Sequence, residues 1–436
     1  MIFVYCNKIT NRVRYIFSLY FEEILGIRIT ITDNLEDFKL FKGPKISYAL
    51  QPICDELFFL SKSLLFENDI KQIDINVFEW DGMKVFFPTN KYSSLPFDPF
   101  SAGFFLVTRY EEYLPHLEDK YDRFEATESF AFQHDFIKKP LLNIWAKLLK
   151  KILLKRYPEL IFRENKYQFI STIDIDNAFA YREKGFIRNF GAFSKALINL
   201  NTDEIKERAK VLLRIVPDPY DTYEFQLAIQ KKYQFKSIYF FLLADYGLND
   251  KNISVNSRRL HSLIKSIADY FEVGIHPGFG SNQNKNKLKT EHKRLELILQ
   301  REVTKSRQHF LKLSFPETYR NLIELNITDD YTMGFASMAG FRSSICTSFY
   351  FYDLDLEIKS PLKIHPFAVM EATLNEYMKL SRQDAIKEFK LLIDEVKAVE
   401  GTFISIWHNE SLSDSKNWIG WRNVYEEMVK YASSDD

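Results

Sequence analysis

STIDIDN, residues Ser171–Asn177, is the most informative segment of this 436-residue sequence. The preceding run, Tyr167–Ile175, has the apolar character of a β-strand, and Asp174 and Asp176 stand at its end, two positions apart. On a strand this spacing puts both side chains on one face. Two carboxylates forced together repel each other unless a cation or a proton relieves them. Taken alone, the pair is still explained more simply as two acidic loop residues at a strand end.

Strand-like and helix-like runs alternate along the chain after this segment. Strands are predicted over residues 167–175, 237–244, 271–275, 307–313 and 402–407. Helices are predicted over residues 223–233, 256–270, 286–302, 316–325 and 381–399. Repeated βα units imply parallel strands, in either a closed barrel or an open doubly wound sheet.

The region before residue 166 has a different, mixed α and β pattern. A chain of this length is too long for one ordinary core, so two domains are expected. A β-hairpin is predicted around Asp81-Gly82, and an amphipathic helix over Pro140–Tyr157. The segment Pro158–Lys166 then marks the boundary. We therefore expect a smaller mixed α+β domain over residues 1–165 and an α/β domain over residues 166–436.

Three of the eight histidines fall at predicted strand ends. His276 leads from a strand into a Pro-Gly turn, His309 alternates with Arg307 on a predicted strand, and His408 ends the last apolar strand. In parallel βα folds the carboxyl ends of the strands meet on one face, where sites are built. Two histidines with a carboxylate form a common catalytic metal set. Together with the aspartate pair, these residues predict a metal site.

Composition and charge exclude several other classes of protein. Hydrophobic residues make up 46% and charged residues 27%, which is typical of an ordered globular chain. The 59 basic and 59 acidic residues cancel, so nucleic acid and anionic membranes are not favoured as partners. No run is long and apolar enough for a membrane span, and the first residues lack a signal-peptide pattern. Three scattered cysteines fit a reducing compartment, so a cytoplasmic location is expected.

The order of the candidate residues resembles the polysaccharide deacetylase superfamily, carbohydrate esterases with a distorted (β/α) barrel. Paired aspartates, a histidine turn after a strand, an arginine strand and a final aromatic-histidine strand follow one another over roughly Tyr167 to Tyr431. The resemblance implies a barrel of this type. It also implies a role for each matching residue: Asp174 as base, Asp176 and His276 as metal ligands, Arg307 as the brace of the base, and His408 as the acid.

Three departures from the family pattern concern the same residues. Ile175 separates the two aspartates, which are usually adjacent in the family. Gly280 holds the place of the second histidine of the metal-binding turn, so we expect His309 to supply that ligand instead. The Pro-x-Gly that usually follows the family's arginine is also missing.

The N-terminal region is similar to an uncharacterised domain that precedes such barrels in some bacterial surface-polysaccharide proteins. LPFD at Leu95–Asp98 and TRYEEY at Thr108–Tyr113 carry this likeness. We expect Arg109, Glu111 and Glu112 to form an ion-paired helix face or a domain contact rather than a site.

The resemblance implies metal-dependent hydrolytic deacetylation of an N-acetylated sugar or polysaccharide precursor. The metal is expected to be Zn²⁺, with Co²⁺ or Ni²⁺ as alternatives, and the partner a carbohydrate. Trp407, beside the acid, is a candidate to stack on a sugar ring. Two alternatives stay open: a non-catalytic sugar-binding relic of the barrel, and a different metal hydrolase, such as an amidase on a non-sugar substrate or a phosphoesterase. The oligomeric state is also open.

Overall fold

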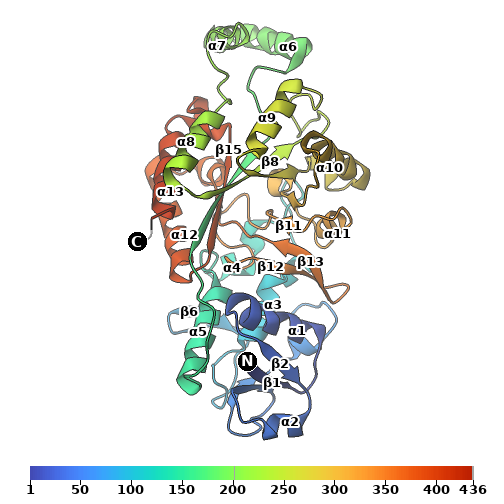
Figure 1. The fold of residues 1–436 in the computed structure, drawn as a ribbon, viewed down its shortest axis with the longest axis vertical. Coiled ribbons are helices and arrows are strands. Elements are labelled where there is room, and N and C mark those ends of the chain that lie inside the picture. Colours follow the sequence, from blue (N-terminus) through green and yellow to red (C-terminus); the bar gives the residue numbers. More distant parts are fainter. Residues whose placement is uncertain (201, 435–436) are drawn as a thin grey trace.

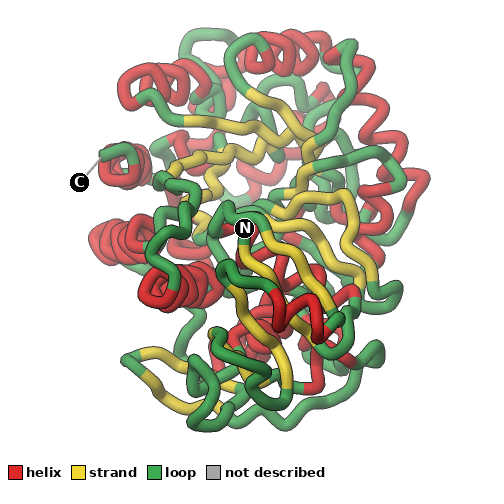
Figure 2. Tube along the Cα trace, turned by 60° about the horizontal axis from the view of Figure 1, so that its bottom comes forward, coloured by secondary structure: helices red, strands yellow, loops and turns green. Residues whose placement is uncertain are grey.

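A computed structural model describes residues 1–200 and 202–434 of the chain. Figure 1 shows an elongated molecule with the N-terminal residues at the bottom and a larger α/β part above them. The helices α6 (Gly185–Ile198) and α7 (Thr202–Leu212) project from the top. Figure 2 shows from a second direction that helices surround many of the strands, whereas other strands lie on the near side around the N-terminus.

The N-terminal region contains a small parallel sheet of order β2-β1-β3-β4 that the sequence analysis did not predict. Its strands are β1 (Ile2–Cys6), β2 (Ile29–Thr32), β3 (Lys45–Ala49) and β4 (Leu57–Leu60). The helices around it are α1 (Asn11–Phe17), which continues as a π-helix over Ser18–Ile24, α2 (Leu35–Leu40), α3 (Pro99–Val107), α4 (Phe130–Gln133) and α5 (Leu141–Arg156). Helix α5 confirms the predicted amphipathic helix.

The predicted hairpin in this region is also confirmed. Strands β5 (Val77–Trp80) and β6 (Met83–Phe86) pair in antiparallel fashion. The turn between them is Asp81-Gly82, and both residues have positive φ angles, of 50° and 71°. A two-residue hairpin turn requires this backbone conformation, which Asp and Gly adopt more readily than most residues.

The larger part is built on a nine-stranded sheet of order β12-β13-β11-β10-β9-β8-β7-β15-β14. The strands are β7 (Gln168–Ile175), β8 (Lys236–Leu242), β9 (Glu272–His276), β10 (Lys305–Ser306), β11 (Asp329–Asp330), β12 (Phe349–Asp353), β13 (Ile358–Ile364), β14 (Val369–Met370) and β15 (Thr402–His408). Every neighbouring pair is parallel except β12–β13. The predicted parallel βα architecture is therefore confirmed.

Hydrogen bonds do not close this sheet into a barrel. The edge strands are β12 and β14, and no ladder joins them within the described residues. Helices accompany the strands: α8 (Tyr223–Tyr233), α9 (Arg258–Ala268), α10 (Lys285–Leu299), α11 (Glu317–Ile323), α12 (Arg382–Ala398) and α13 (Trp421–Ala432). The central strands read as continuous apolar runs because they are covered on both faces. Helix α12 begins as expected, because the Ser381 side chain accepts a hydrogen bond from the Asp384 amide.

A buried ion network links the N-terminal region to the larger part. Glu112 accepts hydrogen bonds from Arg109 Nε at 2.6 Å and from Arg342 Nε and Nη2 at 2.8 and 2.5 Å. Arg109 also pairs with Glu111 at 2.8 Å and donates to the Arg342 carbonyl oxygen. The expectation of an ion-paired contact at TRYEEY is confirmed. Arg109 and Glu112 belong to TRYEEY, whereas Arg342 lies 230 residues after Glu112 in the chain.

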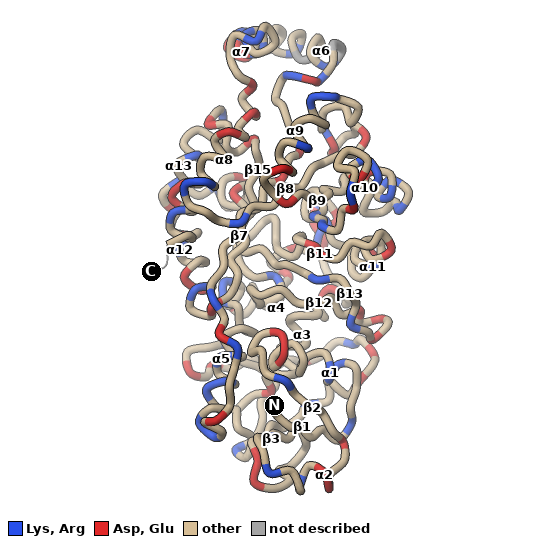
Figure 3. Tube along the Cα trace, viewed as in Figure 1, with Lys and Arg blue, Asp and Glu red and all other residues tan. Residues whose placement is uncertain are grey.

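Elsewhere, charged residues of both signs are interspersed over the whole molecule (Figure 3). This distribution matches the net charge of zero. None of the described helices combines the length and apolar character needed to cross a membrane.

Candidate metal centre

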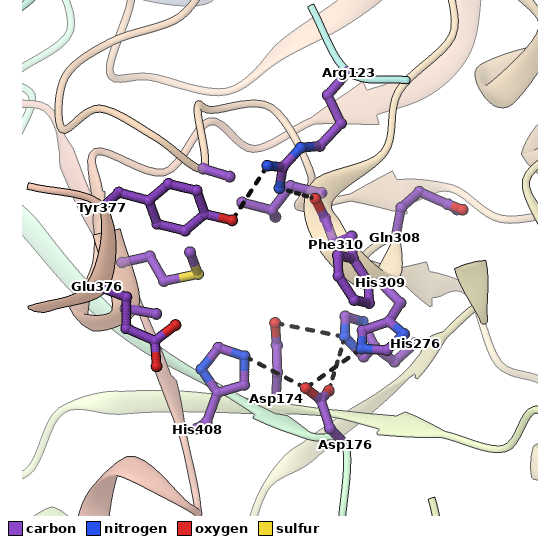
Figure 4. Close-up of a pocket in the computed structure, with 14 residues that line it drawn as sticks. Arg123, Asp174, Asp176, His276, Gln308, His309, Phe310, Glu376, Tyr377 and His408 are labelled. Atoms are coloured by element: carbon purple, nitrogen blue, oxygen red, sulfur yellow. Dashed lines mark hydrogen bonds and ion pairs between the residues drawn. The ribbon is translucent and has the colours of Figure 1, made fainter. Parts of the chain in front are cut away.

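Five of the predicted site residues meet at the carboxyl ends of neighbouring parallel strands. Asp174 is the penultimate residue of β7 and Asp176 directly follows that strand, His276 is the last residue of β9, and His408 is the last residue of β15. His408 lies opposite Asp174 in the β15–β7 register. His309 follows β10 in a short 3₁₀ turn. Figure 4 shows their side chains converging on one pocket.

Asp176, His276 and His309 form the tightest group. Asp176 Oδ1 is 3.2 Å from His276 Nε2, and Asp176 Oδ2 is 3.4 Å from His309 Nε2. One donor atom from each residue lies within 4.8 Å of the other two. Asp176 is the most open of the three, at 29% side-chain exposure, whereas both histidines are buried. The group is therefore compact enough to share one ion and is reached from the pocket.

Both histidines are held so that their Nε2 atoms face the carboxylate. His276 Nδ1 lies 2.6 Å from the carbonyl oxygen of Arg307, to which it must donate its proton. His309 Nδ1 lies 2.8 Å from Asp250 Oδ1. In neutral imidazoles this leaves the Nε2 lone pairs directed at Asp176, an arrangement that a cation between the three groups would satisfy. Two imidazoles and a carboxylate are also the donor set that Zn²⁺, Co²⁺ and Ni²⁺ accept.

The short distances within this group shift the pKa values of Asp176 and His309. Burial raises the pKa of Asp176, but the charge of His309 and hydrogen bonds from His276 and His309 outweigh it, so its pKa lies well below the usual range. Burial lowers the pKa of His309, but Asp176 and Asp250 outweigh it and raise that pKa to about 9. Without a metal, protons therefore take the place of the positive charge between these groups.

Asp174 stands beside this group and is fixed by Arg307. Arg307 Nη1 donates to Asp174 Oδ1 at 3.0 Å and to Thr172 Oγ1 at 2.6 Å, and its Nε donates to the Tyr331 carbonyl oxygen at 3.0 Å. The guanidinium is completely buried and lies over the Phe240 ring. Asp174 Oδ2 is 3.9 Å from His276 Nε2. The carboxylate is thus held by an immobile cation and faces the candidate metal position.

His408 completes the site from the opposite side. Its Nε2 is 3.8 Å from Asp176 Oδ2, and its Nδ1 is 2.8 Å from Glu371 Oε1. Glu371 is fully buried and also accepts the His408 backbone amide at 2.9 Å. Burial lowers the pKa of His408, but the charge and hydrogen bond of Glu371, with Asp176 and Asp174, raise it well above its usual value.

The pocket next to these residues is lined by charged, aromatic and apolar side chains. Its lining includes Arg123, Phe310, Met370, Glu376 and Tyr377 in addition to the aspartates and histidines. Figure 4 shows Arg123 and Tyr377 at the end of the pocket away from Asp176. Burial and the neighbouring Glu371 raise the pKa of Glu376. The cavity therefore offers both ring surface and hydrogen-bonding groups to a ligand.

Two sequence predictions near the site are wrong. Residues 307–313 do not form a strand: β10 ends at Ser306, and Phe310 and Leu311 have positive φ angles that break any extended conformation. Trp407 does not line the pocket. Because β15 alternates its side chains, Trp407 points into the core, is fully buried, and packs on Phe389 and Tyr425.

Three residues that hold or line the site were not predicted from the sequence: Glu371 and Asp250, which contact His408 and His309, and Arg123, which lines the pocket. Glu371 carried one usable signal, because it is a lone acid in the apolar run 367–374. Asp250 lies in the loop between β8 and α9, and no sequence pattern marks it. Arg123 lies in the N-terminal region, which the sequence analysis did not connect to the site at all.

Residues 2–158 match the model of a family of unknown function, DUF7033. No curated protein matches the sequence.

Three solved structures are similar to between 61% and 64% of this chain. A candidate polysaccharide deacetylase from Mycobacterium smegmatis is 13% identical, with a TM-score of 0.42 over 64% of this chain and 87% of that one. A mutant of a CE4 family pseudoenzyme with restored enzymatic activity is 13% identical, with a TM-score of 0.29 over 62% and 64% of the two chains. A polysaccharide deacetylase from Bacillus cereus is 11% identical, with a TM-score of 0.29 over 61% and 88%.

Proposed function

We propose that the chain is a metal-dependent deacetylase of an N-acetylated sugar or polysaccharide precursor. The observation that carries the proposal is the group of Asp176, His276 and His309, whose donor atoms lie within 4.8 Å of one another beside the fixed carboxylate of Asp174. A metal in this position supplies Lewis acidity toward an amide carbonyl and its attacking water. The resemblance of the residue order to polysaccharide deacetylases supports the same chemistry.

The roles of the remaining groups follow from their partners. Asp174 takes the proton of the attacking water, because its other oxygen is held by Arg307 and cannot turn away. His408 gives its proton to the leaving nitrogen, because Glu371 and the two aspartates keep it protonated. Water adds to the carbonyl carbon, the carbon–nitrogen bond breaks, and acetate and a free amine result. Asp174 and His408 thus act as a base and an acid on the two sides of Asp176.

Two observations favour a sugar over other amides. The pocket is open and includes the aromatic side chains Phe310 and Tyr377, and Glu376 lies beside His408 as a hydrogen-bonding group for hydroxyls. A phosphoesterase is less well supported, because the pocket's Arg123 is already paired with Asp119 at 2.5 Å and offers no free phosphate clamp. A non-catalytic relic would have no need of the Arg307–Asp174 and Glu371–His408 pairs, both of which are intact.

Acetate release is the direct test. The protein loaded with Zn²⁺, Co²⁺ or Ni²⁺ should release acetate from at least one of a panel of N-acetylglucosamine oligomers, nucleotide-linked N-acetyl sugars and N-acetylated peptides. Asp174→Asn and His408→Gln serve as matched controls that keep the metal ligands. Release from sugars alone supports the proposal, and release from peptides alone would make the protein an amidase. Sugar binding without any release in the metal-loaded protein would establish the relic.

A further inference from the structure

A short segment of the N-terminal region reaches the metal centre. Residues 119–123 form a tight turn closed by Arg123 and Asp119, whose side chains pair at 2.5 Å, and a bridge between Glu118 and Phe124 flanks it. The Asp119 carboxylate also accepts the Tyr121 and Arg123 amides at 2.8 and 3.1 Å. The turn is therefore stiff by itself. It belongs to residues 2–158, the region that matches a family of unknown function.

This turn holds the loop that carries His309. Arg123 Nη1 donates to the Phe310 carbonyl oxygen at 2.9 Å. Lys312, only 1% exposed, donates to Asp122 Oδ2 at 2.7 Å. The Tyr121 ring packs against Phe310, with 4.9 Å between ring centroids. Residues 121, 122 and 123 of the turn thus contact two of the three residues that follow His309, namely Phe310 and Lys312.

The loop over residues 309–312 has a backbone conformation that depends on these contacts. Phe310 and Leu311 have φ angles of 61° and 57°. Non-glycine residues in the left-handed region cost free energy and persist only where their surroundings impose them. His309 precedes them directly, and its amide is bonded to the Pro277 carbonyl oxygen at 3.0 Å. Any relaxation at Phe310 would therefore turn the His309 imidazole.

The same turn also contacts the other histidine loop. The Tyr121 ring lies 6.4 Å from the Phe279 ring, three residues after His276. The Lys312 ammonium lies over the same Phe279 ring at 4.5 Å. Both loops that carry imidazole ligands are therefore packed beneath the 119–123 turn.

We infer that residues 119–123 are a positioning clamp for the metal centre, and that Arg123 sets the metal affinity by fixing the His309 loop. The inference rests on the metal site of the proposed function. It gives the N-terminal region a role, since that region completes the centre without supplying a ligand. Arg123 acts through Phe310 and contacts no reacting atom. Groups that orient metal ligands in this way typically change metal affinity by roughly 10–100-fold when removed.

The test is a metal titration of the full-length protein without substrate. Zn²⁺ and Co²⁺ dissociation constants are measured by competition with a chromophoric chelator for the wild type, Arg123→Ala, Arg123→Lys and Asp122→Asn. We expect Arg123→Ala to weaken binding by roughly 10–100-fold. Arg123→Lys should recover part of the loss, because one ammonium can still reach the Phe310 carbonyl. Asp122→Asn keeps the left-handed backbone at 122 and should weaken binding less than Arg123→Ala.

Arg12→Ala is the matched control. Arg12 is also a buried arginine of the N-terminal region that pairs with the larger part, at 2.5 Å from Glu357, but it does not line the pocket. It should lower the melting temperature of the metal-free protein and leave the metal dissociation constant unchanged. A loss of affinity in Arg12→Ala equal to that in Arg123→Ala would show general destabilisation and overturn the clamp.

The outcomes separate this inference from the proposed function. If folded Arg123→Ala binds metal as tightly as the wild type, the clamp is wrong, whereas acetate release by the wild type can still stand. If Arg123→Ala does not fold, Arg123→Lys and Asp122→Asn decide, and unchanged affinity in both would overturn the clamp. A wild type that binds metal but releases no acetate would refute the deacetylase and leave the clamp to be judged on affinity alone.

Discussion

His408 and Glu371 form the acid side of the site: the imidazole Nδ1 lies 2.8 Å from a carboxylate oxygen that is completely buried. The same carboxylate accepts the His408 backbone amide, so it fixes both the ring and the chain that carries it. Burial alone would lower the pKa of His408. The charge and hydrogen bond of Glu371 reverse the sign, with help from Asp176 and Asp174. The buried carboxylate of Glu371 thus keeps the proposed acid protonated.

Glu371→Gln should therefore change the pH dependence of catalysis. An anion raises the pKa of a neighbouring imidazole, so its loss lowers the pKa of His408 and deprotonates the acid at a lower pH. The alkaline limb of the kcat/KM profile should move to lower pH by about one unit or more. The profile is measured with the best substrate of the acetate-release panel. An unchanged alkaline limb would mean that His408 is not the acid, or that Glu371 does not set its pKa.

Substitutions of Asp174 and Asp176 should have different effects on metal content and turnover. Asp176→Ala removes one of three clustered ligands and should lose the metal. Asp174→Asn keeps the ligands and removes the base, so it should retain metal but lose turnover by about 10²–10⁴. Elemental analysis of the purified variants, together with acetate release, checks both. Near-stoichiometric metal in Asp176→Ala would refute the ligand assignment.

Trp407→Ala tests the correction to the sugar-stacking prediction. The side chain is fully buried against Phe389 and Tyr425, so its removal leaves a cavity in the core. We expect a loss of about 3–5 kcal/mol in the free energy of unfolding. Under conditions in which the variant is still folded, its KM should be close to that of the wild type. A large rise in KM with little loss of stability would restore the sugar contact.

Glu112→Gln should destabilise the junction between the two parts. Burial raises the pKa of Glu112, but Arg342 and Arg109 outweigh it and lower the pKa from 4.5 to about 2. A carboxylate with a depressed pKa stabilises the fold above its unfolded-state pKa, and this stability is lost as the pH falls towards 2. At neutral pH the variant leaves two buried guanidiniums without this partner and should lose about 3–5 kcal/mol.

The pH dependence provides the control for this prediction. The difference in unfolding free energy between wild type and Glu112→Gln should be largest at neutral pH. It should shrink below pH 4.5, where the wild-type carboxylate takes up its proton. Denaturant unfolding at a series of pH values measures it. A difference that does not vary with pH would indicate lost packing rather than lost charge.

Several features of the fold could be predicted because they depend on local pattern. Continuous apolar runs identified the buried parallel strands, and Ser381 marked the start of α12. The small N-terminal sheet could not be predicted in the same way. Its strands are only four or five residues long, which is too short for a clear local periodicity. Whether the large sheet closes into a barrel depends on the pairing of its edge strands. The alternation of strands and helices in the sequence does not predict that pairing.

The order of residues along the chain was enough to predict most of the acids and histidines of the candidate site. Acids and histidines at strand ends must meet on one edge of a parallel sheet, so Asp174, Asp176, His276 and His408 could be named from order alone. The groups that surround these residues could be found only in the folded chain. Glu371, Asp250 and Arg123 reach the site from segments that are remote in the chain, and their positions follow from packing rather than from spacing. The physical reason is that a strand fixes the direction of its own side chains, whereas the partners of those side chains depend on how distant segments fold against it.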